Sequence, residues 1–151
     1  MITEIIENKL DYASLLTESD PNINLVEDYL KKSRLFVYLE KNEAVSFIVV
    51  QLVSPDTLEI KNILTLENHR GHGYAKKLIK HIENIYQHIP QIIVGTANSS
   101  MANIAFYTKL GYRYSHRIEN FFIDYYAHEI YENGTQAVDL LYFTKSNLGF
   151  N

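Results

Sequence analysis

The feature that most constrains this chain is a turn with two glycines one residue apart, Gly71 and Gly73, between an apolar run and an amphipathic segment. The run at residues 58–66 is rich in branched apolar residues and begins with the alternation of a half-buried strand. In residues 75–85 the apolar side chains recur every three or four positions, which predicts a helix with one buried face. Closely spaced glycines at such a junction leave backbone N–H groups uncovered by side chains, so the turn can bind an anion.

The charge around this turn also favours an anion. The segment from 70 to 80 holds four cations and no carboxylate, although the chain of 151 residues has a formal net charge of -4. The cations are Arg70, Lys76, Lys77 and Lys80. A positive patch on an acidic protein predicts a bound polyanion here. The alternative to an anion site is an ordinary strand-to-helix turn followed by a helix with a solvated lysine face. The glycine patterns of dinucleotide-binding and nucleotide triphosphate-binding loops are absent from this segment.

Residues 70–75 resemble the acetyl-coenzyme A signature of the GNAT superfamily of N-acetyltransferases, which reads Arg/Gln-x-x-Gly-x-Gly/Ala. Arg70, Gly73 and Ala75 match it, and so does its place between a strand and a long helix. The resemblance implies that acetyl-CoA is the co-substrate and that the turn holds its pyrophosphate. The implied contacts come from Arg70, Gly71, His72, Gly73, Tyr74 and Ala75.

A second segment, residues 98–112, resembles the other GNAT motif, Asn-x-x-Ala-x-x-x-Tyr-x-Lys-x-Gly-Phe. Its tyrosine, lysine, glycine and aromatic positions are met by Tyr107, Lys109, Gly111 and Tyr112. Its asparagine and alanine positions hold Ser100 and Asn103, whereas an Asn-Ser-Ser variant of one GNAT subgroup fits residues 98–100. The resemblance therefore leaves open which of Asn98, Ser100 and Asn103 contacts the coenzyme.

The implied chemistry is attack of an amine on a thioester, which needs a base, an oxyanion donor and an acid for the leaving thiolate. Tyr107 is the candidate acid and a coenzyme contact, because a phenol with a pKa of about 10 is protonated at neutral pH. By resemblance Glu59 is the base, directly or through water; an exposed strand residue paired with a lysine is the alternative. The same resemblance assigns the strand edge at Ile63, Leu64 and Thr65 to the pantetheine amides and the oxyanion.

The predicted elements favour one domain over residues 1–151. A first strand at 2–7 and two helices at 11–16 and 23–32 precede a three-strand meander. The strand at 91–95 is connected to the last meander strand through a helix, which predicts that these two strands pair in parallel. The meander strands are expected at 34–40, 44–53 and 58–66. By resemblance the two early helices border the acceptor, with Tyr12, Leu16 and Tyr29 as pocket candidates and core packing as the alternative.

A further helix follows Ser99 and Ser100, which are suitable N-caps, and ends at Gly111. Its expected apolar side is formed by Met101, Ile104, Ala105 and Leu110. The last strands, 112–118 and 137–144, are linked by an aromatic insertion at 120–134. The result is an α/β (α+β) domain of GNAT type, with a mixed, mostly antiparallel sheet and helices on both faces.

The composition excludes several classes of protein. There are no cysteines for disulfides, and the six histidines lack His-x3-His or His-Glu-x2-His spacing, so we expect no metal site. No apolar run approaches the ~20 residues of a membrane span and no secretion signal opens the chain, so we expect a cytoplasmic protein without a membrane partner. Nucleic-acid binding conflicts with the acidic balance and the lack of a basic stripe elsewhere.

The leading hypothesis is an acetyltransferase that moves the acetyl group of acetyl-CoA to a primary amine of a small-molecule or peptide acceptor. The alternative is a non-catalytic domain that senses acyl-CoA and lacks the acid and base. In the insertion, His128, Glu129 and Glu132 are candidates for recognising a cationic acceptor, with a solvated loop as the alternative. The resembled superfamily often forms dimers, and the sequence leaves open whether this chain is a monomer or a homodimer.

Overall fold

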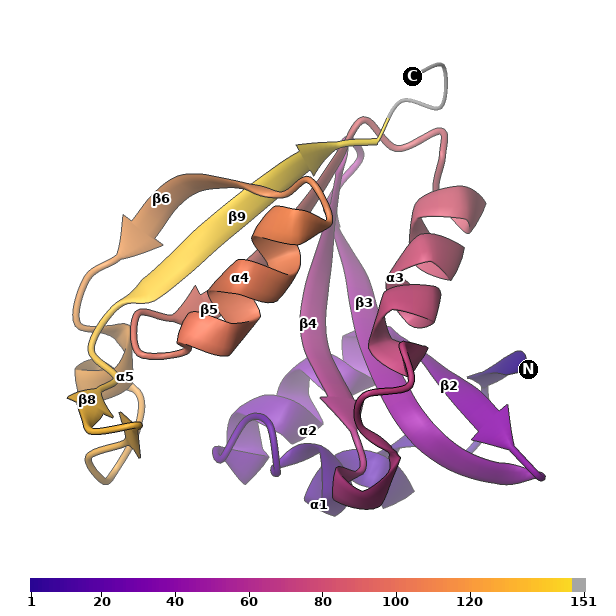
Figure 1. The fold of residues 1–151 in the computed structure, drawn as a ribbon, viewed down its shortest axis with the longest axis horizontal. Coiled ribbons are helices and arrows are strands. Elements are labelled where there is room, and N and C mark those ends of the chain that lie inside the picture. The colour runs from indigo at the N-terminus through magenta and orange to yellow at the C-terminus, as the bar shows by residue number, and fades with distance from the viewer. Residues whose placement is uncertain (148–151) are drawn as a thin grey trace.

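Seven strands form the main sheet of the computed structural model, which describes residues 1–147 (Figure 1). They are β1 (Ile2–Ile5), β2 (Arg34–Glu40), β3 (Glu43–Ser54), β4 (Thr57–Thr65), β5 (Gln91–Ala97), β6 (Arg113–Ile118) and β9 (Leu140–Ser146). Their order is β1-β2-β3-β4-β5-β9-β6. β4 and β5 pair in parallel and the other neighbours pair antiparallel, which confirms the mixed, mostly antiparallel sheet and the predicted crossover.

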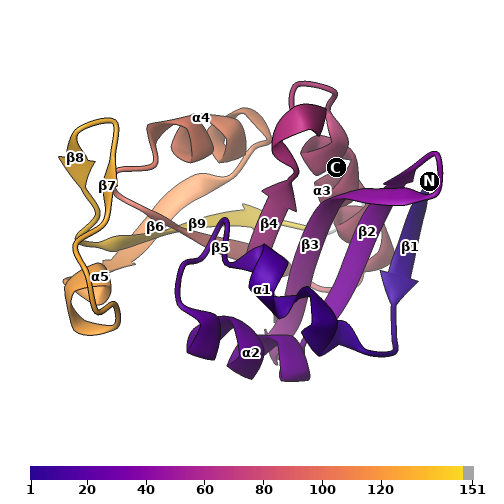
Figure 2. The same ribbon diagram turned by 90° about the horizontal axis from the view of Figure 1, so that it is seen from below.

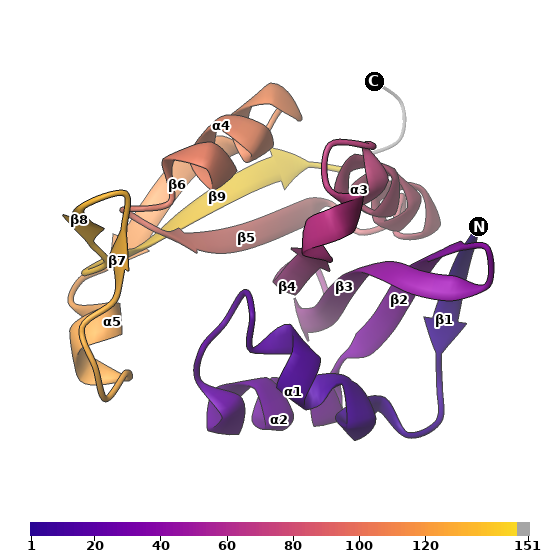
Figure 3. The same ribbon diagram turned by 60° about the horizontal axis from the view of Figure 1, so that its bottom comes forward.

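Helices cover both faces of the sheet, as predicted (Figures 2 and 3). They are α1 (Ala13–Leu16), α2 (Ile23–Lys32), α3 (Tyr74–Ile85), α4 (Met101–Lys109) and α5 (Phe121–Asp124), with 3-10 turns η1 (Lys9–Tyr12) and η2 (Glu67–His69). One core lies between the sheet and α3 with α4, and the other lies between the sheet and α1 with α2. No helix within residues 1–147 is long and apolar enough to cross a membrane.

The long helix α3 buries the stripe that its periodicity predicts. Leu78, Ile79 and Ile82 are fully buried, and they pack against apolar residues of β2, β3 and β4. The hairpin of β2 and β3 closes tightly, although its register shifts between Tyr38 and Leu39: Glu40 pairs with Glu43, and Lys41 and Asn42 form the two-residue loop with φ angles of 51° and 65°. Such a loop matches the right-handed twist of its two strands, so the meander is set by local sequence.

A β-bulge at Lys61 interrupts the regular pairing of β4 with β3. Val50 pairs with Ile60, whereas Val49 pairs with Asn62, so Lys61 is an extra residue without a partner in β3. A bulge bends its strand and increases the local twist. The alternation at the start of this strand in the sequence gave no sign of the interruption.

The bulge changes the face of the sheet on which the side chains of β4 lie. Leu58 and Ile60 pack in the core under α3, whereas Leu64 packs in the core under α1 and α2. Residues at even positions therefore switch faces between Ile60 and Asn62, because successive side chains alternate only where pairing is regular. The switch brings Glu59 and Asn62 to the same face, toward α1 and α2.

The bulge also marks the place where β4 and β5 separate. Residues 57–60 pair with residues 91–94, and within the described chain residues 61–65 have no strand partner on that side. Figure 1 shows the two strands starting together and running apart, so the sheet opens into a V. Residues 61–65 thus present a free backbone edge inside the sheet.

The insertion before β9 is more structured than a loop. It contains α5 and a separate hairpin of β7 (Tyr131–Glu132) and β8 (Thr135–Gln136). Asn133 and Gly134 form the turn with φ angles of 50° and 82°, as the Asn-Gly pair predicts.

Several boundaries differ from the sequence prediction. The first strand ends at Ile5, not at 7. The last strand begins at Leu140 because the N–H group of Ala137 bonds to Ile130 and those of Val138 and Asp139 bond to the Asn98 side chain. The last four residues of the expected domain, 148–151, lie outside the described part of the chain.

The predicted apolar side of α4 is partly wrong. Met101 is 65% exposed and Ala105 is also exposed, while the helix buries Tyr107 and Leu110 and half-buries Ile104. At roughly 100° per residue, positions 101 and 105 lie about 120° and 160° from Tyr107 on the helix surface. Tyr107 is thus the centre of the buried stripe, so the predicted stripe was rotated away from the real contact.

The core under α3 should dominate stability. We expect Leu78→Ala to lower the free energy of unfolding by about 2–5 kcal/mol, because it leaves a cavity in a close-packed site. Leu52→Ala is the matched control, since Leu52 is 49% exposed at the end of β3, and it should cost less than about 1 kcal/mol. Urea denaturation followed by far-UV circular dichroism measures both, and equal losses would contradict the assigned core.

Candidate active site

A cavity of about 350 Å³ lies where β4 and β5 separate. Its walls come from β4, β5, α4, the α1–α2 connection and the insertion at 120–139. Glu59, Ile63, Ser100, Asn103 and Tyr107 all line it. The structure therefore brings together both predicted catalytic residues and several predicted coenzyme residues, from positions up to 48 apart in the chain.

Tyr107 contributes a buried ring with a free hydroxyl. The residue is 3% exposed and its ring packs edge-on against Tyr112, with 6.1 Å between centroids. Within residues 1–147 no buried side-chain oxygen lacks a hydrogen-bond partner, and the Tyr107 hydroxyl, which makes no such bond there, is therefore the part of the side chain that reaches the cavity. Burial raises the pKa of Tyr107 above its ordinary value, because the phenolate would lose its hydration. The group is therefore protonated at neutral pH and can donate into the cavity.

Glu59 is held by two partners on opposite sides of its carboxylate. Its Oε1 lies 3.1 Å from Lys61 Nζ, and its Oε2 accepts a hydrogen bond of 3.1 Å from the Tyr142 hydroxyl. Burial, together with the charge of Glu59, raises the pKa of Tyr142. The lysine pairing in the alternative interpretation is present, but Glu59 is 9% exposed rather than a surface residue.

The glycine turn has the geometry of an anion site. Gly71 and Gly73 have φ angles of +81° and +78°, and nothing lies within 4 Å of the place where a Cβ would stand. α3 begins directly after Gly73, and no side chain caps its first N–H groups. These donors and the positive end of the helix dipole are open to a ligand. Arg70 is fixed beside them by a bond of 3.1 Å from its Nε to the Thr65 carbonyl.

The aromatic residue of the turn anchors it to the sheet. The Tyr74 ring stacks on Tyr38 with 4.4 Å between centroids, and its hydroxyl donates to Glu40, which raises the pKa of Tyr74 to about 12. Lys77 Nζ lies over both rings, and the His72 ring stacks on Tyr74 with 5.6 Å between centroids. Of Tyr74, therefore, the backbone and not the side chain is left for a ligand at the turn.

The predicted strand edge offers backbone rather than side chains. Ile63 lines the cavity, Leu64 is buried under α1 and α2, and Thr65 Oγ1 lies 2.8 Å from Ser46 Oγ. Since residues 61–65 have no strand partner toward β5, their N–H and C=O groups on that side can pair with an extended ligand.

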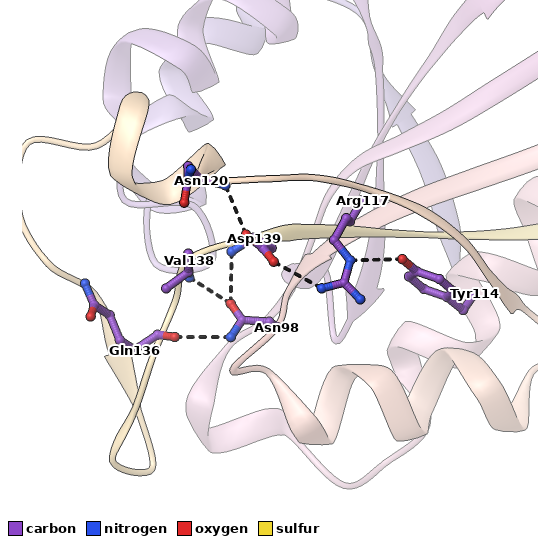
Figure 4. A network of polar contacts seen from close by, with 7 residues as sticks. All are labelled: Asn98, Tyr114, Arg117, Asn120, Gln136, Val138 and Asp139. Carbon is purple, nitrogen blue, oxygen red and sulfur yellow. Dashed lines mark hydrogen bonds and ion pairs between the residues drawn. The ribbon is translucent and has the colours of Figure 1, made fainter.

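The three candidates near the start of α4 have different surroundings, of which Figure 4 shows those of Asn98. Asn98 uses both ends of its amide: Oδ1 accepts from the N–H groups of Val138 at 2.7 Å and Asp139 at 3.1 Å, and Nδ2 donates to the Gln136 carbonyl at 3.3 Å. Asn103 is exposed and makes one long bond of 3.4 Å to Thr96.

Ser100 stands at the N-cap of α4, as predicted, but its hydroxyl does not cap the helix. It donates instead to Glu132 Oε1, which also accepts from Ser99 at 3.1 Å. The carboxylate of the β7–β8 hairpin therefore lies at the positive end of α4, where the helix dipole favours a negative charge.

A polar network fastens both ends of the insertion to the end of β5 (Figure 4). Asp139 Oδ1 accepts from the Asn120 N–H at 3.0 Å, and its Oδ2 pairs with Arg117 at 3.2 Å. The Asp139 carbonyl in turn accepts from the Asn98 N–H at 3.1 Å. Residues 120 and 139 are thus held next to Asn98, and the segment between them becomes a fixed wall of the cavity.

The opposite wall includes residues that sequence reasoning missed. Asp20 accepts hydrogen bonds from Tyr29 at 3.2 Å and from Tyr126 at 2.6 Å, so the α1–α2 connection meets the insertion. Asn62 donates to the Tyr29 hydroxyl at 2.9 Å. Of the three early-helix candidates, Tyr29 lines the cavity, whereas Leu16 is fully buried and Tyr12 packs against Phe47. In the sequence, the aromatic composition of the insertion was the one indication that this segment contributes to a binding cavity.

Comparison with known proteins gives consistent matches. Residues 4–112 match the acetyltransferase (GNAT) family. A curated relative, the uncharacterized N-acetyltransferase YvbK of Bacillus subtilis, is 30% identical over 129 residues, which span 84% of this chain and 83% of the relative. A GNAT family acetyltransferase from Elizabethkingia anophelis with acetyl-CoA bound matches with a TM-score of 0.92 and 28% identity, covering 97% of each chain. A Bacillus subtilis acetyltransferase in complex with CoA matches with a TM-score of 0.87 and 28% identity, covering 96% of this chain and 97% of that one.

The side-chain amide of Asn98 should contribute more to the free energy of unfolding than that of Asn103. We expect Asn98→Ala to lower the free energy of unfolding by about 1–3 kcal/mol, because the N–H groups of Val138 and Asp139 lose their acceptor. Hydrogen exchange of the amides at 120–139 should accelerate in the same variant. Asn103→Ala, which removes one exposed bond, should change stability by less than about 0.5 kcal/mol. Unchanged exchange in Asn98→Ala would contradict the anchoring role.

Proposed function

The chain belongs to the acetyltransferase (GNAT) family, and from that premise we propose that it moves the acetyl group of acetyl-CoA to a primary amine of a small acceptor by direct attack on the thioester. It is an acyltransferase, and acetyl-CoA is its co-substrate. One observation carries the amine proposal: Glu59 and the unbonded hydroxyl of Tyr107 line the same cavity, beside a free strand edge and the open glycine turn.

The coenzyme is held mainly by backbone. N–H groups at 71–76 and the start of α3 bind the pyrophosphate, with Arg70 beside them. The free edge at 63–65 pairs with the pantetheine amides as an added strand would, and an N–H of this edge faces the oxyanion. We assign the side-chain contact from α4 to Asn103, because both ends of the Asn98 amide bond to residues 136–139 and the Ser100 hydroxyl donates to Glu132.

The reaction requires two proton transfers. Glu59 takes a proton from the attacking amine, directly or through water, as the nitrogen forms its bond to the carbonyl carbon. The carbon–sulfur bond then breaks, and Tyr107 donates its proton to the leaving thiolate. The resulting phenolate regains a proton from solvent, and the proton on Glu59 returns to solvent, so the enzyme ends in its starting state.

Burial of Tyr107 suits this role. It raises the pKa of the phenol, which alone would make it a weaker acid. The leaving thiolate lies in the same cavity and is also destabilised by loss of water, which makes it a stronger base. It therefore accepts the proton of a buried phenol more readily than a solvated thiolate would. A hydrogen bond from the phenol is stronger in this low-dielectric site than in water.

The size of the cavity favours a small acceptor. About 350 Å³ is near the lower end of ligand pockets and must admit the acetyl group as well. A compact amine or a single flexible chain end can enter it, whereas a folded protein surface cannot.

The function is tested in two steps. Calorimetry with acetyl-CoA measures binding, and thiol release with a panel of primary amines then measures transfer. We expect tight binding and release that depends on the amine. Binding without amine-dependent release would refute catalysis and support the acyl-CoA sensor.

Tyr107→Phe tests the acid. Turnover should fall by roughly 10²-fold or more while the dissociation constant for acetyl-CoA changes little, because the ring is kept and the proton donor is lost. Tyr131→Phe is the control, since Tyr131 is 57% exposed and does not line the cavity. Full turnover in Tyr107→Phe would remove Tyr107 from the mechanism.

Gly73→Glu tests the turn. The added carboxylate should abolish detectable binding of acetyl-CoA in calorimetry through steric block and repulsion of the pyrophosphate. Gly73→Asn is the control, because asparagine tolerates a φ of +78° better than most residues and carries no charge. It should bind far better than Gly73→Glu, and both should fold, because the space above Gly73 is open. Equal affinity of Gly73→Glu and the unmodified protein would contradict the phosphate site.

A further inference from the structure

The cavity carries more negative charge than its one cation neutralises. Three carboxylates line it, from Asp20, Glu59 and Glu132, together with the ammonium group of Lys61. Lys61 pairs with Glu59. Within residues 1–147 neither Asp20 nor Glu132 has a lysine, arginine or histidine partner. Two carboxylates thus face one small cavity without a counter-charge.

The carboxylate of Asp20 is fixed in place by neutral donors. Tyr29 and Tyr126 reach it from α2 and from the insertion, and each binds a different oxygen atom. Hydroxyl groups orient a carboxylate without neutralising it, so the site keeps a full negative charge. In keeping with this, burial and the Asp20 charge raise the pKa values of Tyr29 and Tyr126.

Aromatic side chains line the same cavity as this carboxylate. Phe121, Phe122 and Tyr126 line the same cavity, and the Phe122 and Tyr126 rings lie 5.0 Å apart between centroids. Aromatic faces attract ammonium groups through their negative π clouds, most strongly where water is excluded. An oriented carboxylate beside such faces is chemically suited to an organic cation.

A metal ion fits these groups poorly. Nowhere in residues 1–147 do three or more acidic or histidine side chains come together as a metal site requires, so the three carboxylates lie on separate walls. Glu132 differs from Asp20 because it lies at the positive end of α4 and accepts from two serines there. The helix dipole partly balances Glu132, which leaves Asp20 as the carboxylate with the least compensation.

The proposed catalytic groups line the same cavity. Tyr107 is 3% exposed and its side chain lines the cavity together with Glu59. Tyr107 and Glu59 come from α4 and β4, whereas Asp20 comes from the α1–α2 connection. A ligand that contacts the catalytic groups and Asp20 at once needs one group to react and another to be recognised.

We propose that the acceptor carries a second positive charge besides the amine that reacts, and that the Asp20 carboxylate binds this charge beside the aromatic wall. The inference rests on the proposed transfer to amines and narrows its substrate class to short diamines. The diamine lies with one ammonium group at Asp20, and its other nitrogen, once deprotonated, attacks at the Glu59 and Tyr107 end.

Matched amines test the proposal in binding and in turnover. The probes are 1,3-diaminopropane, 1,4-diaminobutane and 1,5-diaminopentane, each compared with the monoamine of the same chain length, in the presence of CoA for binding and of acetyl-CoA for turnover. At least one diamine should bind, and reach a kcat/KM, about tenfold or more better than its monoamine, because a charged contact in a dry site outweighs one in water. Diamines that bind no better than their monoamines would overturn the proposal.

Variants separate the charge of Asp20 from its role in joining the two walls. Asp20→Asn keeps the shape of the side chain and should bring the ratio of diamine to monoamine, in binding and in kcat/KM, close to onefold. Tyr126→Phe weakens the contact between the walls but keeps the carboxylate, so it should keep the preference. Asp56→Asn, in an exposed turn outside the cavity, makes the same change of charge and should leave all values unchanged.

The outcomes distinguish the two levels of inference. If the preference survives in Asp20→Asn, or is lost equally in Tyr126→Phe, the assigned cation site is wrong. If the diamine binds with the predicted dependence on Asp20 but no amine releases thiol, the cation site stands and the proposed acetyl transfer fails. Thermal denaturation of each variant shows whether it is folded.

Discussion

The parallel pairing between β4 and β5 is limited to four residues on each strand, and the rest of the site depends on this limit. Pairing ends at Ile60, the bulge follows at Lys61, and the strands then run apart. Had the ladder continued, the backbone groups of residues 61–65 would be satisfied by β5 and no extended ligand could bind there. The site thus exists because a buried sheet leaves its own hydrogen bonds unmade over one short stretch.

The two ends of this opening carry opposite charge. At the glycine turn, Arg70 and the uncapped start of α3 present positive charge that suits the phosphates of the coenzyme. In the cavity, the carboxylates of Asp20, Glu59 and Glu132 outnumber the ammonium of Lys61. An anionic and a cationic substrate would therefore be guided to different ends, and either would be repelled from the wrong one. The net charge of the chain conceals this separation.

Local sequence was sufficient to predict the glycine turn and helix proposed to bind the coenzyme, and insufficient to predict the cavity proposed to bind the acceptor. The stripe of Leu78, Ile79 and Ile82 and the two glycines report contacts within a few residues, so periodicity and turn chemistry could predict them. The bulge at Lys61 depends on the register with β3, which no local pattern encodes. The bond from Tyr126 to Asp20 joins residues 106 apart, and the amide of Asn98 binds residues about 40 positions later. Such contacts depend on the assembled fold, and in the sequence only the aromatic content of the insertion indicates them.

The two halves are also stabilised by different forces. Behind the coenzyme turn, α3 buries whole aliphatic side chains, each worth about 2 kcal/mol or more. The insertion at 120–139 is instead tied down by hydrogen bonds at Asn98, Asp139 and Asp20, each contributing about 1 kcal/mol on balance. Since these bonds lie outside the apolar cores, the wall can change sequence, or open locally, without unfolding the sheet. The wall of the cavity can therefore vary while the glycine turn and α3 stay constant, because hydrogen bonds stabilise the first and apolar burial stabilises the second.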